Sequence, residues 1–288
     1  MKKFLTVSAI ISAGILSFNN TLIAQSKSAA GDLVVQWNFI TIKTAKAAKQ
    51  NSNLASRTAA VEAIAVYDAV NSIKHFGTPY HYNATVTGPA SAQAAVAQAA
   101  HDVLVSFFPA QKPALDSALD NSIQGIKEDA IDNGRKAGAA SAADILALRA
   151  NDGSSPLTTY AGPEKPGVGA YRPTPGKFAH GIDVEWGNVK PFLLKDGKQF
   201  LPVAPPAIGS DEYKKALAEV NELGETKSTK RTEDQTHIAQ FYKQDAELTV
   251  NEAARLLAVS HGKSLEENAL IFALVDIDLS QITGKVKR

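Results

Sequence analysis

The residues of this 288-residue sequence best suited to acid–base or metal chemistry are its histidines. The six are His75, His81, His101, His180, His237 and His261. Two histidines on one helix can bind a metal together when they lie three or four residues apart, and none of the six has such a neighbour. His101 and His237 fall within predicted helices, where a hydrogen-bonded structural histidine is the usual outcome. The histidines therefore predict no metal site.

Other short catalytic signatures are missing or weak. The sequence has no HExxH metalloprotease motif, no Walker-type glycine loop and no GxSxG nucleophile elbow. Ser260-His261-Gly262 has the residue types of an anion-binding nucleophile loop, but its glycine is already explained as a helix stop. Glu62 and Asp68 do not share a helix face, so their spacing does not indicate paired carboxylates. We predict no catalytic, cofactor-binding or metal-binding residue.

Composition narrows the class of protein further. The net charge is +1 and the 30 lysines and arginines are scattered, which excludes the basic stripe of a nucleic-acid-binding protein. The sequence contains no cysteine, which excludes disulfides, zinc–thiolate sites and thiol nucleophiles. Aromatic residues are sparse and alanine is frequent, a composition that favours close-packed helices. A chain of this length forms one large domain or two modest ones.

The N-terminus has the pattern of a secretory signal peptide. Two lysines precede an apolar run over residues 4–18, and the small residues that follow suit cleavage after Ala24 or Ala30. An uncleaved membrane anchor is the alternative, but the run is short for a bilayer span. We expect residues 1–30 to be a signal peptide and spacer, and the mature protein to be secreted or periplasmic and free of the membrane.

The elements that would position a site are helices. Residues 31–151 form a first helical group, which Asp32 opens as an N-cap. Within it, residues 56–73 are apolar on nearly every face and predict a central buried helix. Further helices are predicted at residues 91–108, 113–126 and 132–150. No stretch alternates with period two for long enough to predict a sheet.

Residues 152–209 change the character of the sequence. Proline and glycine recur every few residues, a density of helix breakers that excludes a helix. A disordered linker is one alternative, but disordered segments are poor in aromatic residues. This segment contains Tyr160, Tyr171, Phe178, Trp186, Phe192 and Phe200. We therefore expect an ordered loop that wraps the helices and covers or lines a site.

Residues 210–284 form a second helical group, opened by Ser210 as an N-cap. Three capping-box pairs are predicted to open successive helices: Thr232 with Gln235, Thr249 with Glu252, and Ser264 with Glu267. The predicted fold is thus all-α, a multi-helix bundle with a long Pro/Gly-rich ordered loop between two helical groups.

The last predicted helix is apolar around its whole circumference, which is typical of a helix buried in a larger protein. Asp276 and Asp278 interrupt this surface. A buried carboxylate would need a partner, whereas one at a solvated edge needs none, and we expect both aspartates at such an edge. The helix itself is expected to need a covering surface, from a partner chain or from a C-terminal half that is absent here.

An ordered set of segments resembles the N-terminal half of vanadium-dependent haloperoxidases, which belong to the phosphatidic acid phosphatase type 2 superfamily. The segments include "VVQWN" (34–38), "SRTAAVEAIAVYDAVNSI" (56–73), "ILALRANDGS" (145–154), "YRPTPGKFAHGIDVEWGNVKPFLL" (171–194) and "KSLEENALIFALVDIDL" (263–279). The resemblance implies a helical bundle over residues 31–288. In the complete family, bound vanadate and peroxide oxidise halides, and phosphatase relatives hold phosphate in the same pocket.

The resemblance also implies where the chemistry resides. The family holds its oxyanion through three blocks, Lys-x6-Arg-Pro, Pro-Ser-Gly-His and Ser-Arg-x5-His, because an oxyanion needs several fixed cationic donors. One histidine bonds the metal and another is the acid–base catalyst. Lys165 and Arg172 match the first block by spacing, but lie in the Pro/Gly-rich loop, and the other two blocks do not occur in these 288 residues. We expect no vanadate contact at this pair.

We therefore interpret the sequence as a truncated vanadium-dependent haloperoxidase-like protein. It is expected to bind no cofactor alone and to be inactive alone, since the catalytic C-terminal half is absent. Two alternatives remain open. One is an exported helical binding or scaffold module. The other is half of a split haloperoxidase or acid phosphatase that a partner chain completes.

Overall fold

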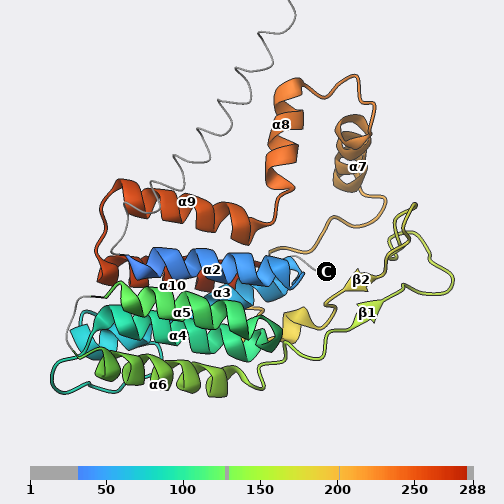
Figure 1. The fold of residues 1–288 in the computed structure, drawn as a ribbon. Coiled ribbons are helices and arrows are strands. Elements are labelled where there is room, and N and C mark those ends of the chain that lie inside the picture. Colours follow the sequence, from blue (N-terminus) through green and yellow to red (C-terminus); the bar gives the residue numbers. More distant parts are fainter. Residues whose placement is uncertain (1–31, 127–129, 201, 284–288) are drawn as a thin grey trace, which may run out of the picture.

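The computed structural model describes residues 32–126, 130–200 and 202–283, so the predicted signal peptide lies outside the described residues. The all-α prediction is confirmed (Figure 1). The first helical group comprises α2 (Leu33–Ala47), α3 (Ser52–Lys74), α4 (Ala92–Phe107), η1 (Pro109–Gln111), α5 (Lys112–Gln124) and α6 (Ile131–Arg149). The second comprises α7 (Asp211–Gly224), α8 (Glu233–Tyr242), α9 (Ala246–Ser260) and α10 (Leu265–Thr283). None of the helices within the described ranges is long and apolar enough to cross a bilayer.

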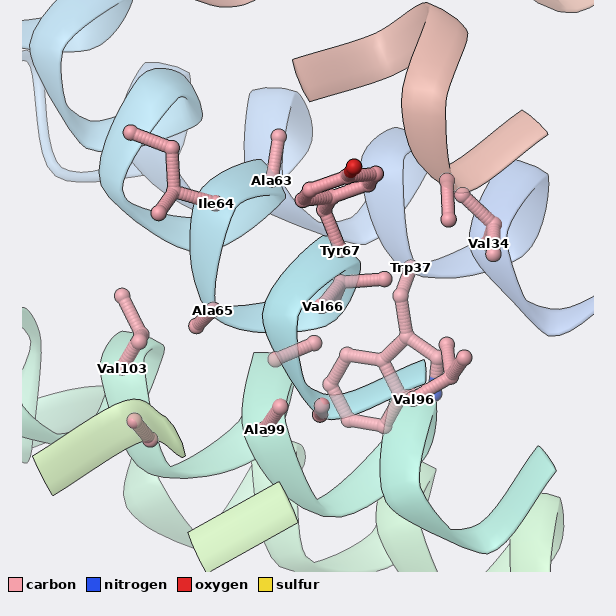
Figure 2. Packing of buried hydrophobic residues seen from close by; sticks show 14 of the residues in the cluster. Val34, Trp37, Ala63, Ile64, Ala65, Val66, Tyr67, Val96, Ala99 and Val103 are labelled. Carbon is pink, nitrogen blue, oxygen red and sulfur yellow. The ribbon is translucent and has the colours of Figure 1, made fainter. Parts of the chain in front are cut away.

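The centre of the bundle is α3, as its sequence predicts. It packs against α2, α4, α6 and α10, and nearly all of its residues are buried. Figure 2 shows how Trp37 of α2 reaches across to Val96 of α4. The Trp37 side chain is fully buried, and its indole N–H donates to the Ser122 hydroxyl at 3.2 Å. Small and branched side chains on α3 let four helices approach it, which buries apolar area on every side.

The helices α4 and α6 approach each other closely, and two glycines of α6 make this approach possible. A Cβ atom built on Gly138 would lie 2.4 Å from the Ala95 carbonyl oxygen, and one on Gly134 would lie 2.1 Å from the Ser91 carbonyl oxygen. Both obstacles are backbone atoms, which cannot rotate away. Glycine is therefore required at these positions in spite of its low helix propensity.

We expect Gly138→Ala to lower the free energy of unfolding by about 1–3 kcal/mol, the range for an overpacked core, although alanine favours helix. Denaturant unfolding followed by circular dichroism measures the change. Gly167→Ala is the matched control, because nothing lies within 4 Å of a Cβ atom at that position. Equal stability of the two variants would contradict the close α4–α6 contact.

Two of the three predicted capping boxes are confirmed. Thr232 and Gln235 cap each other's backbone at the start of α8, and Ser264 and Glu267 do the same before α10. The third prediction is wrong. The helix α9 begins at Ala246, directly after its N-cap residue Asp245. Thr249 therefore lies inside the first turn and is not an N-cap. The extra turn brings Glu247 to Ser52 of α3, a tertiary contact that the local sequence does not reveal.

The second helical group does not form one compact layer. Figure 1 shows α10 within the bundle, α9 lying over α2, and α7 and α8 extending away from the bundle. Neither α7 nor α8 has a buried residue. The helix α10 packs on α3 but leaves Leu270 and Leu274 exposed, so its apolar circumference is only partly covered.

The Pro/Gly-rich segment contains little regular structure. Its strands β1 (Thr159–Tyr160) and β2 (Gly181–Ile182) form one short antiparallel pair, which the sequence does not predict, and η2 (Trp186–Asn188) follows. Asp183 anchors the segment by accepting hydrogen bonds from the amides of Asn51 and Asn53. Two of its six aromatic side chains, Trp186 and Phe192, are buried; Tyr160, Tyr171, Phe178 and Phe200 are exposed. The segment contacts the bundle at Asp152, which bonds Arg57, and along residues 183–194, where the N–H groups of Leu193 and Leu194 donate to the Gln281 side chain of α10.

Candidate functional site

An open cavity of about 540 Å³ lies beside α10. Its walls come from α3, the end of α6, the loop at residues 78–81 and residues 190–193. Apolar side chains of α10 line one wall at helical spacing: Leu270, Ala273, Leu274 and Ile277. The cavity therefore combines an apolar helix face with polar groups from two loops, which is the composition of many ligand-binding clefts.

One carboxylate positions the loop that borders the cavity. Asp68 of α3 accepts hydrogen bonds from the backbone N–H groups of Tyr80, His81 and Tyr82 at 2.7–2.9 Å. Burial raises the pKa of Asp68, although the three hydrogen bonds act in the opposite direction. His81 extends outward from this loop and pairs with Asp144 at 2.5 Å.

Two tyrosines of the cavity wall are hydrogen-bonded to the backbone. The Tyr80 hydroxyl donates to the Phe192 carbonyl at 2.8 Å, and the Tyr67 hydroxyl donates to the Thr78 carbonyl at 2.9 Å. Burial raises the pKa of both hydroxyls, so both remain protonated at neutral pH. These groups can orient a ligand but do not supply a base.

Arg149 is the buried cation of the cavity wall, and its guanidinium already has hydrogen-bond partners. Its guanidinium bonds to Asp152 at 2.8 Å, donates to the Lys190 carbonyl at 2.5 Å and lies 4.0 Å from the centre of the Phe192 ring. Arg57 bonds to the same aspartate at 2.8 Å, which completes a buried Arg–Asp–Arg cluster. Arg149 therefore holds residues 190–192 against the bundle and has little capacity left to grip an oxyanion.

A second buried polar cluster joins four helices. Asp276 of α10 accepts from the Asn251 amide at 2.7 Å and the Asn38 amide at 3.3 Å, while Arg255 donates to the Asn38 side-chain oxygen at 2.7 Å. Glu62 of α3 lies beside this network. Burial, followed by the charge of Asp276, raises the pKa of Glu62 to about 8. Burial likewise raises the pKa of Asp276 to about 7.

This cluster overturns the expectation for Asp276, which we placed at a solvated edge. The side chain is fully buried, whereas Asp278 is exposed as expected. The two residues differ because α10 presents Asp276 toward α2 and α9, whose asparagines supply its partners. Asn38 and Asn251 carry no sequence signal of this role, since they meet across 213 residues of chain.

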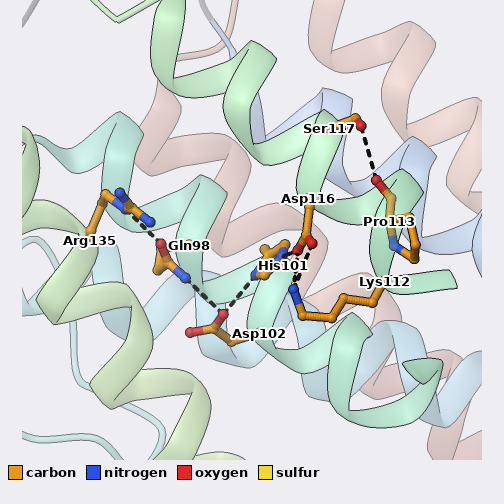
Figure 3. Close-up of polar contacts among 8 residues, drawn as sticks. All are labelled: Gln98, His101, Asp102, Lys112, Pro113, Asp116, Ser117 and Arg135. Carbon is orange, nitrogen blue, oxygen red and sulfur yellow. Dashed lines mark hydrogen bonds and ion pairs between the residues drawn. The ribbon is translucent and has the colours of Figure 1, made fainter. Parts of the chain in front are cut away.

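His101 lies in a third polar cluster (Figure 3). One ring nitrogen lies 2.7 Å from Asp102 and the other 2.9 Å from Asp116, and Lys112 also bonds Asp116. Burial acts to lower the pKa of His101, but the hydrogen bonds and charges of the two aspartates outweigh it and raise the pKa. With both nitrogens bonded, His101 is the structural histidine that its helical position predicts.

The short motifs do not assemble into a site. Lys165 is exposed, and Arg172 donates to carbonyls of its own loop, at 3.3 Å to Gly167 and 3.5 Å to Pro166. Gly262 has a φ of 56°, which confirms its role as the left-handed stop after α9. No group of three or more histidine or acidic side chains within residues 32–126, 130–200 and 202–283 could hold a metal ion.

Comparisons with known proteins identify the fold. No family model matches the sequence, and no curated protein matches it. Among solved structures, a bacterial vanadium-dependent iodoperoxidase, described as the first of its kind, is similar with a TM-score of 0.68 and 17% sequence identity. The match covers 88% of this chain and 66% of that chain. The helical fold is therefore haloperoxidase-like, and this chain spans 66% of the length of that relative.

Proposed function

We propose that this chain is the helical framework of a vanadium-dependent haloperoxidase-like protein and that it does not oxidise halides by itself. The observation that carries the proposal is the fold match to the iodoperoxidase over 88% of the chain. The sequence supports the second part of the proposal, the lack of halide oxidation, because these 288 residues contain neither the Pro-Ser-Gly-His block nor the Ser-Arg-x5-His block. The chain has the framework without the groups that hold the anion.

The chemistry of an oxyanion supports the same proposal. Vanadate and phosphate need several cationic donors that converge on one point and are fixed before the anion arrives. The buried Arg57 and Arg149 are paired with Asp152, and the partly exposed Arg255 donates to Asn38 of the asparagine network. Lys165 and Arg172 lie on an exposed loop, where Arg172 donates to the Gly167 carbonyl at 3.3 Å. Arg57 and Arg149 do converge, but on the Asp152 carboxylate, which takes the place that a bound oxyanion would need.

The test is halide oxidation by the purified mature protein. We expect the rate with vanadate, hydrogen peroxide and iodide or bromide to equal the protein-free rate, and titration calorimetry to detect no vanadate or phosphate binding. A bacterial vanadium iodoperoxidase is the positive control. Halide oxidation that Arg172→Ala abolishes would overturn the proposal and place the anion at the Pro/Gly-rich loop.

An exported binding module is the second candidate, and the cavity beside α10 favours it. An apolar wall with two oriented tyrosine hydroxyls suits a small apolar molecule with one polar group. The signal-peptide pattern supports export to the periplasm or the cell exterior. Saturable binding of such a molecule, lost on Leu274→Glu, would favour this candidate over the framework role.

A further inference from the structure

The ring of His101 lies between two carboxylates, one on its own helix α4 and one on α5. Its Nδ1 lies 2.7 Å from an Asp102 oxygen, and its Nε2 lies 2.9 Å from an Asp116 oxygen (Figure 3). An ionised carboxylate only accepts hydrogen bonds, and a neutral imidazole has a single N–H to donate. Both contacts are therefore satisfied together only when the ring carries two protons, as an imidazolium.

Lys112 keeps the Asp116 carboxyl in its ionised form. The Lys112 ammonium, one turn before Asp116 on α5, donates to both carboxylate oxygens, at 2.8 Å and 2.6 Å. The hydrogen bonds from Lys112 and His101 lower the pKa of Asp116 below its ordinary value of 3.8. Asp116 is therefore a carboxylate at any pH at which His101 titrates, and it cannot supply the proton of its contact with the ring.

The Asp102 carboxyl is linked to α6 through a glutamine. The Gln98 side chain donates to Asp102 at 2.8 Å and accepts from Arg135 of α6 at 2.8 Å. The charged groups that surround the ring are thus Asp102 of α4, and Asp116 and Lys112 of α5, with Arg135 one hydrogen-bonded residue further away (Figure 3). The ring therefore joins α4 to α5 within a chain of polar contacts that begins on α6.

The contact at His101 matters for α5 because little of this helix is buried. Of its 13 residues, Leu115 and Leu119 alone are buried. The helix also accepts a hydrogen bond from the Trp37 indole at the Ser122 hydroxyl, 3.2 Å away. A helix of this length is marginal in water and is maintained by its tertiary contacts. A change of charge at His101 therefore acts on a weakly held part of the bundle.

We propose that His101 is a pH-sensitive latch, whose imidazolium holds α5 against α4 and whose deprotonation in alkaline solution loosens α5 while the rest of the bundle stays folded. The neutral ring donates to one aspartate and turns a nitrogen lone pair toward the other, which replaces an attraction by a repulsion. The latch goes beyond the framework role proposed above and does not depend on it.

The latch is closed on the acid side of its titration. Although burial acts to lower the pKa of His101, the two aspartates raise it above its ordinary value of 6.5. A group with a raised folded pKa stabilises fully below its unfolded pKa, and this contribution is lost as pH rises through the folded pKa. The contact between α4 and α5 is therefore complete below pH 6.5 and weakens on the alkaline side of that value.

Thiol labelling tests the latch at a single site, because the sequence has no cysteine of its own. Leu119→Cys places one thiol on the buried face of α5. Its labelling rate is compared with and without His101→Gln at each pH, so the intrinsic pH dependence of the thiol cancels in the ratio. We expect His101→Gln to accelerate labelling at least about threefold at pH 5.5 and less than about 1.5-fold at pH 10. An equal ratio at the two pH values would overturn the proposal.

Ala142→Cys on α6 separates local loosening of α5 from global unfolding. Ala142 is fully buried, and the thiol at this position should label at the same rate with and without His101→Gln at both pH values. Parallel acceleration at positions 119 and 142 would show that the whole bundle opens, which would overturn a latch confined to α5.

Proton NMR titration of the His101 ring checks the latch without a substitution in the core. We expect the pKa of His101 to lie above 6.5 and to fall on Asp116→Asn, which removes one of the two charges beside the ring. Asp120→Asn is the matched control, because it removes the same charge from an exposed position one turn further along α5. A pKa of His101 at or below 6.5, or equal shifts in the two variants, would overturn the proposal.

Discussion

Arg149→Met is expected to lower the free energy of unfolding by about 3 kcal/mol, near the lower end for a broken buried ion pair. Arg149 is almost completely buried, and methionine retains its apolar stem without its donors. Asp152 would keep Arg57 as its remaining cationic partner, which limits the loss. The Lys190 carbonyl would lose its 2.5 Å hydrogen bond, so residues 190–192 should detach first.

Guanidinium unfolding measures the total loss, and hydrogen exchange at residues 190–194 measures the local one. Lys214→Met is the control, because Lys214 forms an exposed pair with Asp211 at 3.3 Å and should cost less than about 1 kcal/mol. Similar losses in both variants would show that Arg149 does not hold the segment. Faster exchange without global destabilisation would confine its role to that segment.

Asp276→Asn is expected to remove about half of the pH dependence of stability between pH 4 and pH 8, since the buried Glu62 carboxyl contributes a comparable share. The pKa of Asp276 is raised by burial from its ordinary value of 3.8 to about 7 in the folded protein. Well below pH 3.8 the carboxyl is protonated in both the folded and unfolded states, so its burial does not lower stability there. As pH rises toward 7, the unfolded state releases the proton and the folded state retains it, so stability falls.

The Asp276 share of this loss should be roughly 2–4 kcal/mol by pH 8, and the neutral asparagine should remove that share. Chemical unfolding at a series of pH values measures the slope. Asp278→Asn, two residues further along α10 and exposed, is the control and should keep the wild-type slope. Glu62→Gln should also flatten the slope, because the Glu62 carboxyl has a pKa of about 8 and is coupled to Asp276. An unchanged slope in Asp276→Asn would show that this carboxyl does not titrate between pH 4 and pH 8.

Sequence alone determined the helical fold and most helix boundaries. The alanine-rich pattern of α3 predicted a buried helix, and the Thr232–Gln235 box predicted the start of α8, because both signals depend on neighbours three or four residues away. The ordered segments also pointed to the haloperoxidase fold, which the iodoperoxidase match supports. Local periodicity and capping carry this information within single helices.

Tertiary structure decided which side of each helix meets another. The capping box predicted for Thr249 and Glu252 does not form. The helix α9 starts one turn earlier, with Asp245 as its N-cap residue and Glu247 in contact with Ser52. Asp276 is buried because asparagines 238 and 25 residues away surround it. Leu256 and Leu257 of α9 are likewise exposed because Glu247, Asn251 and Arg255 bond to α3, α10 and α2 on the opposite side of the helix. Periodicity identifies a stripe on a helix, but the stripe that becomes buried depends on partners that only the folded chain brings together.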